Sequence, residues 1–255
     1  MADVYDMHCH LGFAADAPAL ARGGAAAGVR ALSCAVTPDD FVATRELLAP
    51  YPDLHAALGL HPWWVADGRV GAPDLACFEE LAEQTPFIGE IGLDFAGARA
   101  NAREAQAEAL RRALAATAPR GGRLYSVHAV HAADAVLDLL DEAGAFAPDA
   151  GNDVVFHWFS GTSAELARAR ARGCCFSVGP RMLATRRGRA YARDLPADRL
   201  LLETDAPSRL GEALEAAAWQ AQLDDALAQL AAARGDDPAE LAATLAATSA
   251  RLLAR

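Results

Sequence analysis

The sequence contains no lysine, and all 23 of its basic residues are arginines. This absence excludes a carboxylated lysine, which is one group that can bridge two metal ions in a protein. The arginines are outnumbered by 34 acidic residues, which leaves a net charge of −11 at pH 7. Such a charge argues against a general affinity for the nucleic-acid backbone, so an anionic substrate would have to be attracted locally.

Long apolar runs, a leader segment and a cysteine framework are also missing. Apolar residues make up 53% of the 255 positions, but no run is long enough to span a membrane, which predicts a soluble protein without a membrane partner. The N-terminal stretch Met1–Asp6 has neither the basic segment nor the apolar core of a signal peptide. Five cysteines, odd in number and without a C-x-x-C spacing, predict reduced thiols in a cytoplasmic protein.

Strand-like and helical segments alternate along the whole chain. The strand-like runs are Val4–His10, Arg30–Val36, Leu54–Leu60, Phe87–Leu93, Arg123–His128, Asp153–Phe159, Cys174–Val178 and Leu200–Glu203. The helical stretches are Ala17–Ala27, Asp39–Leu48, Asp74–Glu83, Arg99–Ala118, Ala132–Ala143, Ala164–Arg172, Arg186–Arg193, Gly211–Arg234 and Pro238–Leu253. Without any linker-like segment, this alternation predicts a single domain over residues 1–255, an α/β fold of one (β/α)8 TIM barrel with extra C-terminal helices. A doubly wound open sheet is the alternative, but no G-x-G-x-x-G motif follows the first strand-like run.

The first strand-like run closes with the motif Asp6-Met-His8-Cys-His10. Two histidines separated by one residue on an extended strand point to the same face. Such a pair of imidazoles suits a borderline divalent metal better than a protein core. On this motif alone, a purely structural role for the pair stays open.

Further candidate ligands recur where later strands are expected to end. They are His61, Glu90, His128, His157 and Asp205. In a barrel the carboxyl ends of the strands converge on one mouth, so these side chains should form one cluster with the first pair. Four histidines and two carboxylates fit a centre of two metal ions about 3.5–4 Å apart. The expected grouping is His8, His10 and Asp205 on one ion, His128 and His157 on the other, and Glu90 between them.

Several motifs together resemble the TatD family of metal-dependent hydrolases. They are Asp6-Met-His-Cys-His10, Gly59-Leu-His-Pro62, Gly89-Glu-Ile-Gly-Leu-Asp94, Phe156-His-Trp-Phe-Ser-Gly161 and Glu203-Thr-Asp-Ala-Pro207. The resemblance implies a TIM barrel of the amidohydrolase superfamily and a metal-dependent DNase, often a 3′–5′ exonuclease. It also implies the ligand set assigned above, and for His61 a contact with the scissile phosphate.

Three segments resemble one particular group within the family, and two other positions depart from the family pattern. The segments Gly121–His128, His157–Thr162 and Phe176–Pro180 look most like the TatD-type nucleases of Qat antiphage cassettes. His131 stands where similar proteins commonly carry arginine, and Ser208-Arg-Leu-Gly-Glu212 runs almost directly into a helix where the family often has a polar, basic loop. The motifs of the metal centre therefore match those of the family, while the rim expected to contact the substrate departs from the family pattern.

Several residues beside the candidate ligands keep more than one interpretation. The tryptophans Trp63, Trp64 and Trp158 are placed to stack on bases, although ordinary packing at the mouth is slightly favoured. Arg181 or Arg186 would contact a phosphate backbone, or lie on a solvated helix face. His131 fits a helix-cap neighbour, a support for a ligand or a phosphate contact equally well. Asp6 and Asp94 are expected to orient ligands rather than to bind metal.

The leading hypothesis is a metal-dependent hydrolase that cleaves DNA phosphodiester bonds through a metal-activated water, as a 3′–5′ exonuclease-type DNase. Asp205 would accept the proton of the water, next to the bridging Glu90, while His61, Arg181 and His131 would hold the phosphate. The expected cofactors are two divalent ions of Zn, Mn, Mg, Fe, Ni or Co. The expected partner is single-stranded DNA or a DNA end. The alternatives are a small-molecule amidohydrolase or lactonase with the same centre, and a nuclease subunit with protein partners in a defence complex.

Overall fold

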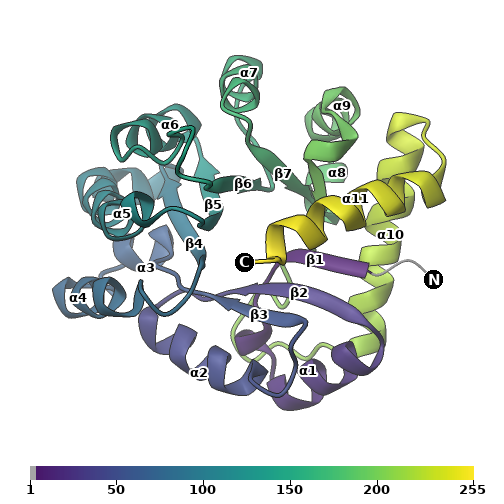
Figure 1. The fold of residues 1–255 in the computed structure, drawn as a ribbon, viewed down its shortest axis with the longest axis horizontal. Helices are drawn as coiled ribbons and strands as arrows, with labels where there is room; N and C mark the ends of the chain where they lie inside the picture. Colours follow the sequence, from purple (N-terminus) through teal and green to yellow (C-terminus); the bar gives the residue numbers. More distant parts are fainter. Residues whose placement is uncertain (1–3) are drawn as a thin grey trace.

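The computed structural model describes residues 4–255 of the chain (Figure 1). The expectation that no signal peptide is present rests partly on residues 1–3, which lie outside the described residues. Within the described part, parallel strands alternate with helices, and each strand overlaps one of the expected runs. The strands are β1 (Val4–Cys9), β2 (Val29–Cys34), β3 (Leu54–Ala57), β4 (Phe87–Asp94), β5 (Leu124–Val130), β6 (Asp153–His157), β7 (Cys175–Val178) and β8 (Leu200–Leu202).

The strands form two arcs, β1-β2-β3 and β4-β5-β6-β7-β8, that join into a barrel. Leu58, just after β3, pairs with Ile88 of β4 in a parallel bridge. At the other seam, the N–H of Asp205 donates to the carbonyl of His8 at 2.9 Å, and the N–H of His10 donates to the carbonyl of Ala206 at 3.0 Å. The strands therefore form a closed ring, which confirms the predicted (β/α)8 barrel and is incompatible with an open doubly wound sheet.

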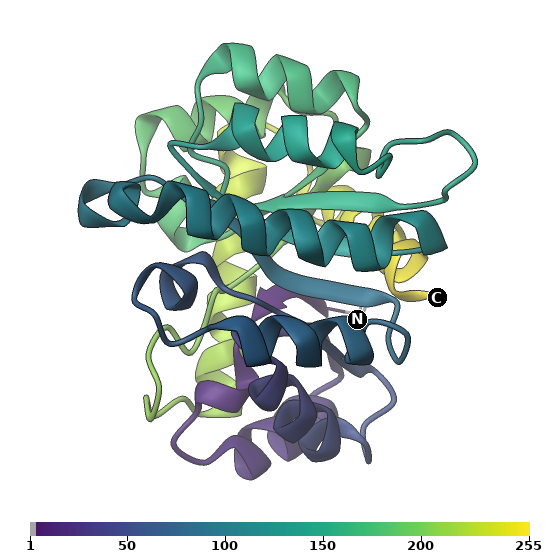
Figure 2. The ribbon, with the colours of Figure 1, turned by 90° about the vertical axis from the view of Figure 1, so that its left-hand side faces the viewer.

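Helices cover the outside of the barrel. The longer ones are α1 (Ala17–Ala26), α2 (Pro38–Leu48), α4 (Ala72–Leu81), α5 (Arg103–Thr117), α6 (Ala133–Glu142), α7 (Ser163–Ala171), α9 (Arg186–Asp194), α10 (Ala216–Arg234) and α11 (Pro238–Leu253). Figure 2 shows α4, α5, α6 and α7 stacked side by side along one flank. None of the described helices has the length and apolar character needed to cross a membrane.

The extra C-terminal helix α11 closes the end of the barrel where the strands begin (Figure 1). Its residues Leu252 and Leu253 pack in one apolar cluster with Tyr5 of β1, Leu124 of β5 and Leu201 of β8. The interior is therefore filled and sealed at this end. Access to the barrel axis is left at the opposite end, where the strands finish.

The main differences from the sequence-based expectation are two short helices and the late start of α10. The helices α3 (Pro62–Ala66) and α8 (Pro180–Leu183) follow β3 and β7 directly, and they are too short to give a helical period. The helix expected from Gly211 is wrong in its start, because α10 begins only at Ala216. Gly211 has a left-handed backbone with φ of 77°, which ends any helical path at this point.

Candidate metal centre at the barrel mouth

The structure brings the candidate ligands of six strands together at the open end of the barrel. They are His8, His10, His61, Glu90, His128, His157 and Asp205. Glu90 lies at the centre and is only 1% exposed. The histidines are likewise buried, because each side chain turns from its strand end toward the barrel axis rather than outward.

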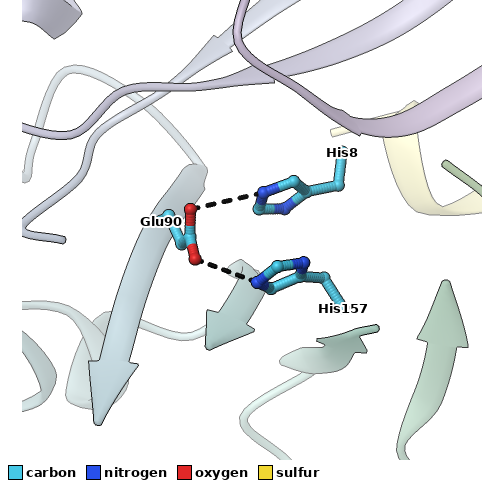
Figure 3. Close-up of side chains that lie close together, drawn as sticks. All are labelled: His8, Glu90 and His157. Carbon is cyan, nitrogen blue, oxygen red and sulfur yellow. Dashed lines mark ion pairs between the residues drawn. The ribbon is translucent and has the colours of Figure 1, made fainter. Parts of the chain in front are cut away.

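The two carboxylate oxygens of Glu90 face different sets of imidazoles. Figure 3 shows one oxygen directed to His8 and the other to His157, whose rings are stacked with centroids 3.9 Å apart. On the first side, Oε2 lies 3.4 Å from Nε2 of His8 and 3.4 Å from Nε2 of His10. Asp205 completes this side, with Oδ1 at 3.3 Å from Nε2 of His10 and 3.9 Å from Nε2 of His8.

On the second side, Oε1 of Glu90 is surrounded by three other imidazoles. It lies 2.7 Å from Nδ1 of His128, 2.9 Å from Nε2 of His157 and 3.2 Å from Nε2 of His61. The facing nitrogens of His128 and His157 are 3.2 Å apart. The two oxygens of Glu90 therefore face different imidazoles, with His8 and His10 on one side and His128, His157 and His61 on the other.

Hydrogen bonds on the far side of the rings decide which nitrogen faces the cluster with a lone pair. Nδ1 of His10 donates to the carbonyl of Cys34 at 2.7 Å, so its Nε2 carries no proton in the neutral ring. Nδ1 of His8 lies 2.7 Å from the hydroxyl of Ser126. His61 is different, because its Nδ1 accepts the N–H of Trp63 at 3.1 Å. Its neutral ring therefore presents an N–H group to the cluster rather than a lone pair.

The chemistry of the donor set fits divalent metal ions. Nε2 of His8, which faces Glu90 and Asp205, is buried and has no hydrogen-bond partner within residues 4–255. Leaving a buried polar atom without a partner is costly, so such atoms point to a missing ligand. The sets His8–Glu90–His157 and His8–His10–Asp205 each offer ligand atoms within 4.8 Å of one another. Imidazole nitrogen and carboxylate oxygen are the donors that Zn and similar metals accept.

Burial and mutual charge set the protonation of the cluster. Burial would raise the pKa of Glu90, but electrostatic contacts with the neighbouring imidazoles and a hydrogen bond with His10 hold this pKa well below its ordinary value. The pKa of Asp205 is lowered to about 2 against the effect of burial, mainly by the contact with His10. Burial lowers the pKa of His8 to about 3. At neutral pH these carboxylates are therefore anionic and His8 is neutral, which is the state in which such groups bind a metal.

His128 has the opposite tendency in the absence of a metal. Burial favours its neutral form, but hydrogen bonds to Asp94 and Glu90 raise its pKa to about 9. Its Nε2 lies 3.2 Å from Oδ2 of Asp94, which also accepts the indole N–H of Trp63. Because a histidine ligand must give up the proton on its metal-facing nitrogen, metal binding at His128 would release a proton.

Buried carboxylates beneath the cluster hold the segments that carry the ligands. Asp6 accepts hydrogen bonds from the Thr204 hydroxyl at 2.6 Å, the Trp219 indole at 2.7 Å and the His8 N–H at 3.3 Å. It therefore ties β1 to the segment that leads into Asp205, whose backbone is left-handed with φ of 55°. Asp94 in turn holds His128 and Trp63. The positions of both carboxylates agree with the orienting role expected of them.

Of the two residues expected to hold the phosphate together with His61, Arg181 lines the cavity over the cluster and His131 does not. Arg181 donates from Nη1 to Oδ2 of Asp205 at 2.7 Å, so it contacts the cluster through a carboxylate. His131 is exposed just after β5 and is not among the residues that line the cavity over the cluster. Ser126 and the indole of Trp63 contact the cluster, although nothing in their local sequence singled out these contacts.

The cluster forms the floor of a cavity of about 260 Å³ at the mouth. Its walls combine aromatic and cationic side chains, namely Phe13, Trp63, Trp64, Trp158, Arg69, Arg181 and Arg209. A larger cavity of about 650 Å³ lies between α10, α11 and β1, and aliphatic side chains such as Leu223 and Leu245 dominate its lining. Since this larger cavity holds none of the candidate ligands, the smaller one at the mouth is the candidate site.

A barrel with a histidine and carboxylate cluster at the carboxyl ends of its strands defines a metal-dependent hydrolase. The family described as TatD related DNase matches residues 5–254, and the chain therefore belongs to this family. The predicted family is confirmed.

Individual relatives agree with this assignment. A protein of Cronobacter sakazakii named 3′-5′ ssDNA/RNA exonuclease TatD is 37% identical over 66% of this chain and 65% of its own length. The protein of the same name from Citrobacter rodentium is 31% identical over 82% of this chain and 80% of its own length. The crystal structure of YJJV, a TatD homologue from Escherichia coli K12, superposes with a TM-score of 0.75 and 25% identity, covering 98% of this chain and 97% of that one.

Proposed function

We propose that this protein hydrolyses phosphodiester bonds at the ends of single-stranded DNA, with two divalent metal ions in the cluster. The observation that carries the proposal is the division of the cluster by Glu90, whose two oxygens face two separate groups of ligand atoms. The relatives named as 3′-5′ ssDNA/RNA exonucleases support a single-stranded nucleic acid and a 3′–5′ direction, and they extend the candidate substrate to RNA.

The ligand groups follow the two sides of Glu90. His8, His10 and Asp205 would hold one ion, His128 and His157 the other, and Glu90 would contact both. Bound there, the ions would polarise the phosphate and lower the pKa of a water molecule that attacks phosphorus. The identity of the metal stays open among Zn, Mn, Mg, Fe, Ni and Co, all of which accept these donors.

Asp205 is the residue of this chain that would take the proton of the attacking water. Together with Glu90 it supplies the carboxylates that line the cavity, and its side chain is 14% exposed whereas that of Glu90 is 1% exposed. A carboxylate that is both ionised and open to the cavity can orient a water molecule and accept its proton. Glu90, enclosed by imidazoles, is restricted to holding metal.

His61 and two arginines would hold the phosphate. The Nε2–H of His61 points into the cluster because its Nδ1 is occupied by the N–H of Trp63. A neutral imidazole in this tautomer is a hydrogen-bond donor, so it suits a phosphate oxygen and not a metal ion. Arg181 and Arg209 add positive charge at the mouth of a protein whose net charge is −11. They supply the local attraction that an anionic substrate needs.

The narrower resemblance to the TatD-type nucleases of Qat antiphage cassettes, with a cytoplasmic location and protein partners in a defence complex, belongs to this proposal. Its support is the sequence of three segments, Gly121–His128, His157–Thr162 and Phe176–Pro180. Two of these segments carry candidate ligands, and the third leads into Arg181. Nuclease activity of the isolated chain, compared with that of the chain purified with its partners, tests whether such a complex is needed.

The test of the proposed function uses single-stranded oligonucleotides labelled at the 3′ or the 5′ end, with protein loaded in turn with each metal. A 3′–5′ exonuclease releases the 3′ label at once as a mononucleotide and shortens the 5′-labelled strand stepwise. Intact oligonucleotide, or cleavage equal to that of Asp205→Asn, would refute the proposal. Turnover of lactones or amides that exceeds nuclease activity would favour the small-molecule alternative, since the same centre can activate water against a carbonyl carbon.

A further inference from the structure

Two large apolar side chains are exposed in residues 4–255, and both line the cavity over the cluster. Trp63 is 38% exposed and Leu210 is 72% exposed. A single exposed apolar residue needs no explanation, but apolar surface gathered at the rim of one pocket marks a place where a ligand binds. The phosphate-binding floor of the same cavity suggests which part of a ligand would reach these side chains.

The loop that carries Leu210 is held in place by its own hydrogen bonds. The carboxylate of Glu212 accepts the N–H of Ser208 at 2.9 Å and the N–H of Arg209 at 3.1 Å. The N–H of Gly211 donates to the carbonyl of Phe13 at 2.7 Å, which fastens the loop to the segment after β1. The outward position of Leu210 is therefore a property of an ordered loop, and not of a frayed end.

Trp63 is equally fixed. Its indole N–H donates to Oδ2 of Asp94, and the guanidinium of Arg99 lies 4.0 Å from the centre of its ring. The edge of the ring meets His61 and His128, with centroids 5.1 Å and 5.9 Å away. A rigid indole in contact with candidate residues of the metal centre is placed to touch whatever group is attached to a phosphate bound there.

We propose that Trp63 and Leu210 form a binding subsite for one unstacked nucleobase next to the scissile phosphate. This inference rests on the proposed function and adds the feature of the substrate that is recognised. Every nucleobase has an apolar π-face, so contact with an indole and an isobutyl group binds bases without regard to their sequence. A base can reach the subsite only after it has left its stack, which favours single strands over duplex.

The test compares oligonucleotides that differ only in the base at the cleaved end. One substrate is a single-stranded 3′ end of ordinary nucleotides, and the other is the same strand with abasic sites at its last two positions. For the wild-type protein we expect kcat/KM to be about 10-fold higher on the strand that has bases. Leu210→Ala should lose most of this preference by slowing cleavage of the base-containing strand alone. Binding of a fluorescein-labelled poly(dT) strand to metal-free protein should weaken in the same variant.

Controls separate the subsite from general damage. Trp63→Phe keeps an aromatic face and should retain most of the preference. Leu227→Ala removes a partly buried leucine from the cavity beside α10 and α11, away from the mouth, and should leave the preference unchanged.

The outcomes distinguish the inference from the function it rests on. Equal cleavage of both strands by the wild-type protein, or an equal loss on both strands in Leu210→Ala, would overturn the subsite while the nuclease stands. Absence of cleavage of either strand by the wild-type protein would overturn the proposed function, and the subsite with it.

Discussion

Arg181 and Asp205 form an ion pair at the mouth of the barrel, with Nη1 of the guanidinium 2.7 Å from Oδ2 of the carboxylate. The arginine side chain is 44% exposed and also lies over the ring of Trp158, at 5.4 Å from the ring centre. The ion pair therefore links Asp205, which we propose as the proton acceptor, to the positive charge of Arg181, which would attract a phosphate. Since the contact is open to solvent, substrate can draw the guanidinium away without disturbing the fold.

Removal of the Arg181 side chain should weaken substrate binding and leave the stability of the fold almost unchanged. For Arg181→Ala we expect KM for a single-stranded oligonucleotide to rise about 10-fold, and the slope of log(kcat/KM) against log salt concentration to flatten by about 1. The free energy of unfolding should change by less than about 1 kcal/mol, because exposed ion pairs contribute little. Arg187→Ala, an exposed arginine on α9 outside the cavity lining, is the matched control. A salt dependence equal to that of the wild type would count against a phosphate contact by Arg181.

Asp205→Asn keeps the shape of the side chain and removes its charge. We expect kcat to fall by about 10²–10⁴, because a positioned proton acceptor contributes this much to a rate. Elemental analysis of the same sample shows whether metal has also been lost, since Asp205 is a candidate ligand. Asp225→Asn, on the exposed face of α10, should keep wild-type kcat. A variant at Asp205 with full metal content and undiminished kcat would contradict the assigned role.

The barrel could be predicted from the sequence because its strands correspond to short apolar runs that are separated by helical segments. Each run marks a buried strand, and the barrel topology then places every strand end at one mouth. His8, Glu90 and Asp205 are predicted to meet on that ground although they are far apart in the chain, and the structure brings carboxylate oxygens of Glu90 and Asp205 within 4 Å of Nε2 of His8. Periodicity and topology are enough to locate such a cluster.

Contacts that depend on side-chain direction between neighbouring strands could not be predicted in this way. The hydroxyl of Ser126 reaches His8 across 118 residues of sequence, and the indole of Trp63 reaches Asp94 across 31. The start of α10 was misplaced for a related reason. The loop before it is fixed by the carboxylate of Glu212 and by the carbonyl of Phe13, and neither interaction has a periodic signature in the sequence.

Stability at high pH should depend on Tyr125, which is fully buried in β5 and donates to the hydroxyl of Thr117 at 3.0 Å. Burial raises its pKa from 10.0 to about 12. The unfolded chain therefore loses this proton first, so the contribution of Tyr125 is complete below pH 10 and is lost as the pH rises to 12. The loss amounts to about 2–3 kcal/mol. Urea unfolding of wild-type protein and Tyr125→Phe at pH 9 and pH 11.5 measures it. The gap in unfolding free energy should shift in favour of the phenylalanine variant at the higher pH, and a constant gap would refute the assignment.

Ser126 should control metal affinity through His8, because its hydroxyl lies 2.7 Å from Nδ1 of that ring. An Nδ1–H that donates to this oxygen leaves the lone pair of Nε2 directed at the cluster, where Nε2 is buried without a partner in the described chain. In Ser126→Ala both tautomers become accessible, and we expect the metal dissociation constant to rise about 10–100-fold. Competition with a chelator measures the affinity, and nitrogen chemical shifts of His8 in the metal-free protein report the tautomer. Ser163→Ala, whose hydroxyl contacts only Tyr191 among the described residues, should leave both unchanged. Weakened binding with an unaltered tautomer would assign the effect to packing, because a lost hydrogen bond must change the ring as well as the affinity.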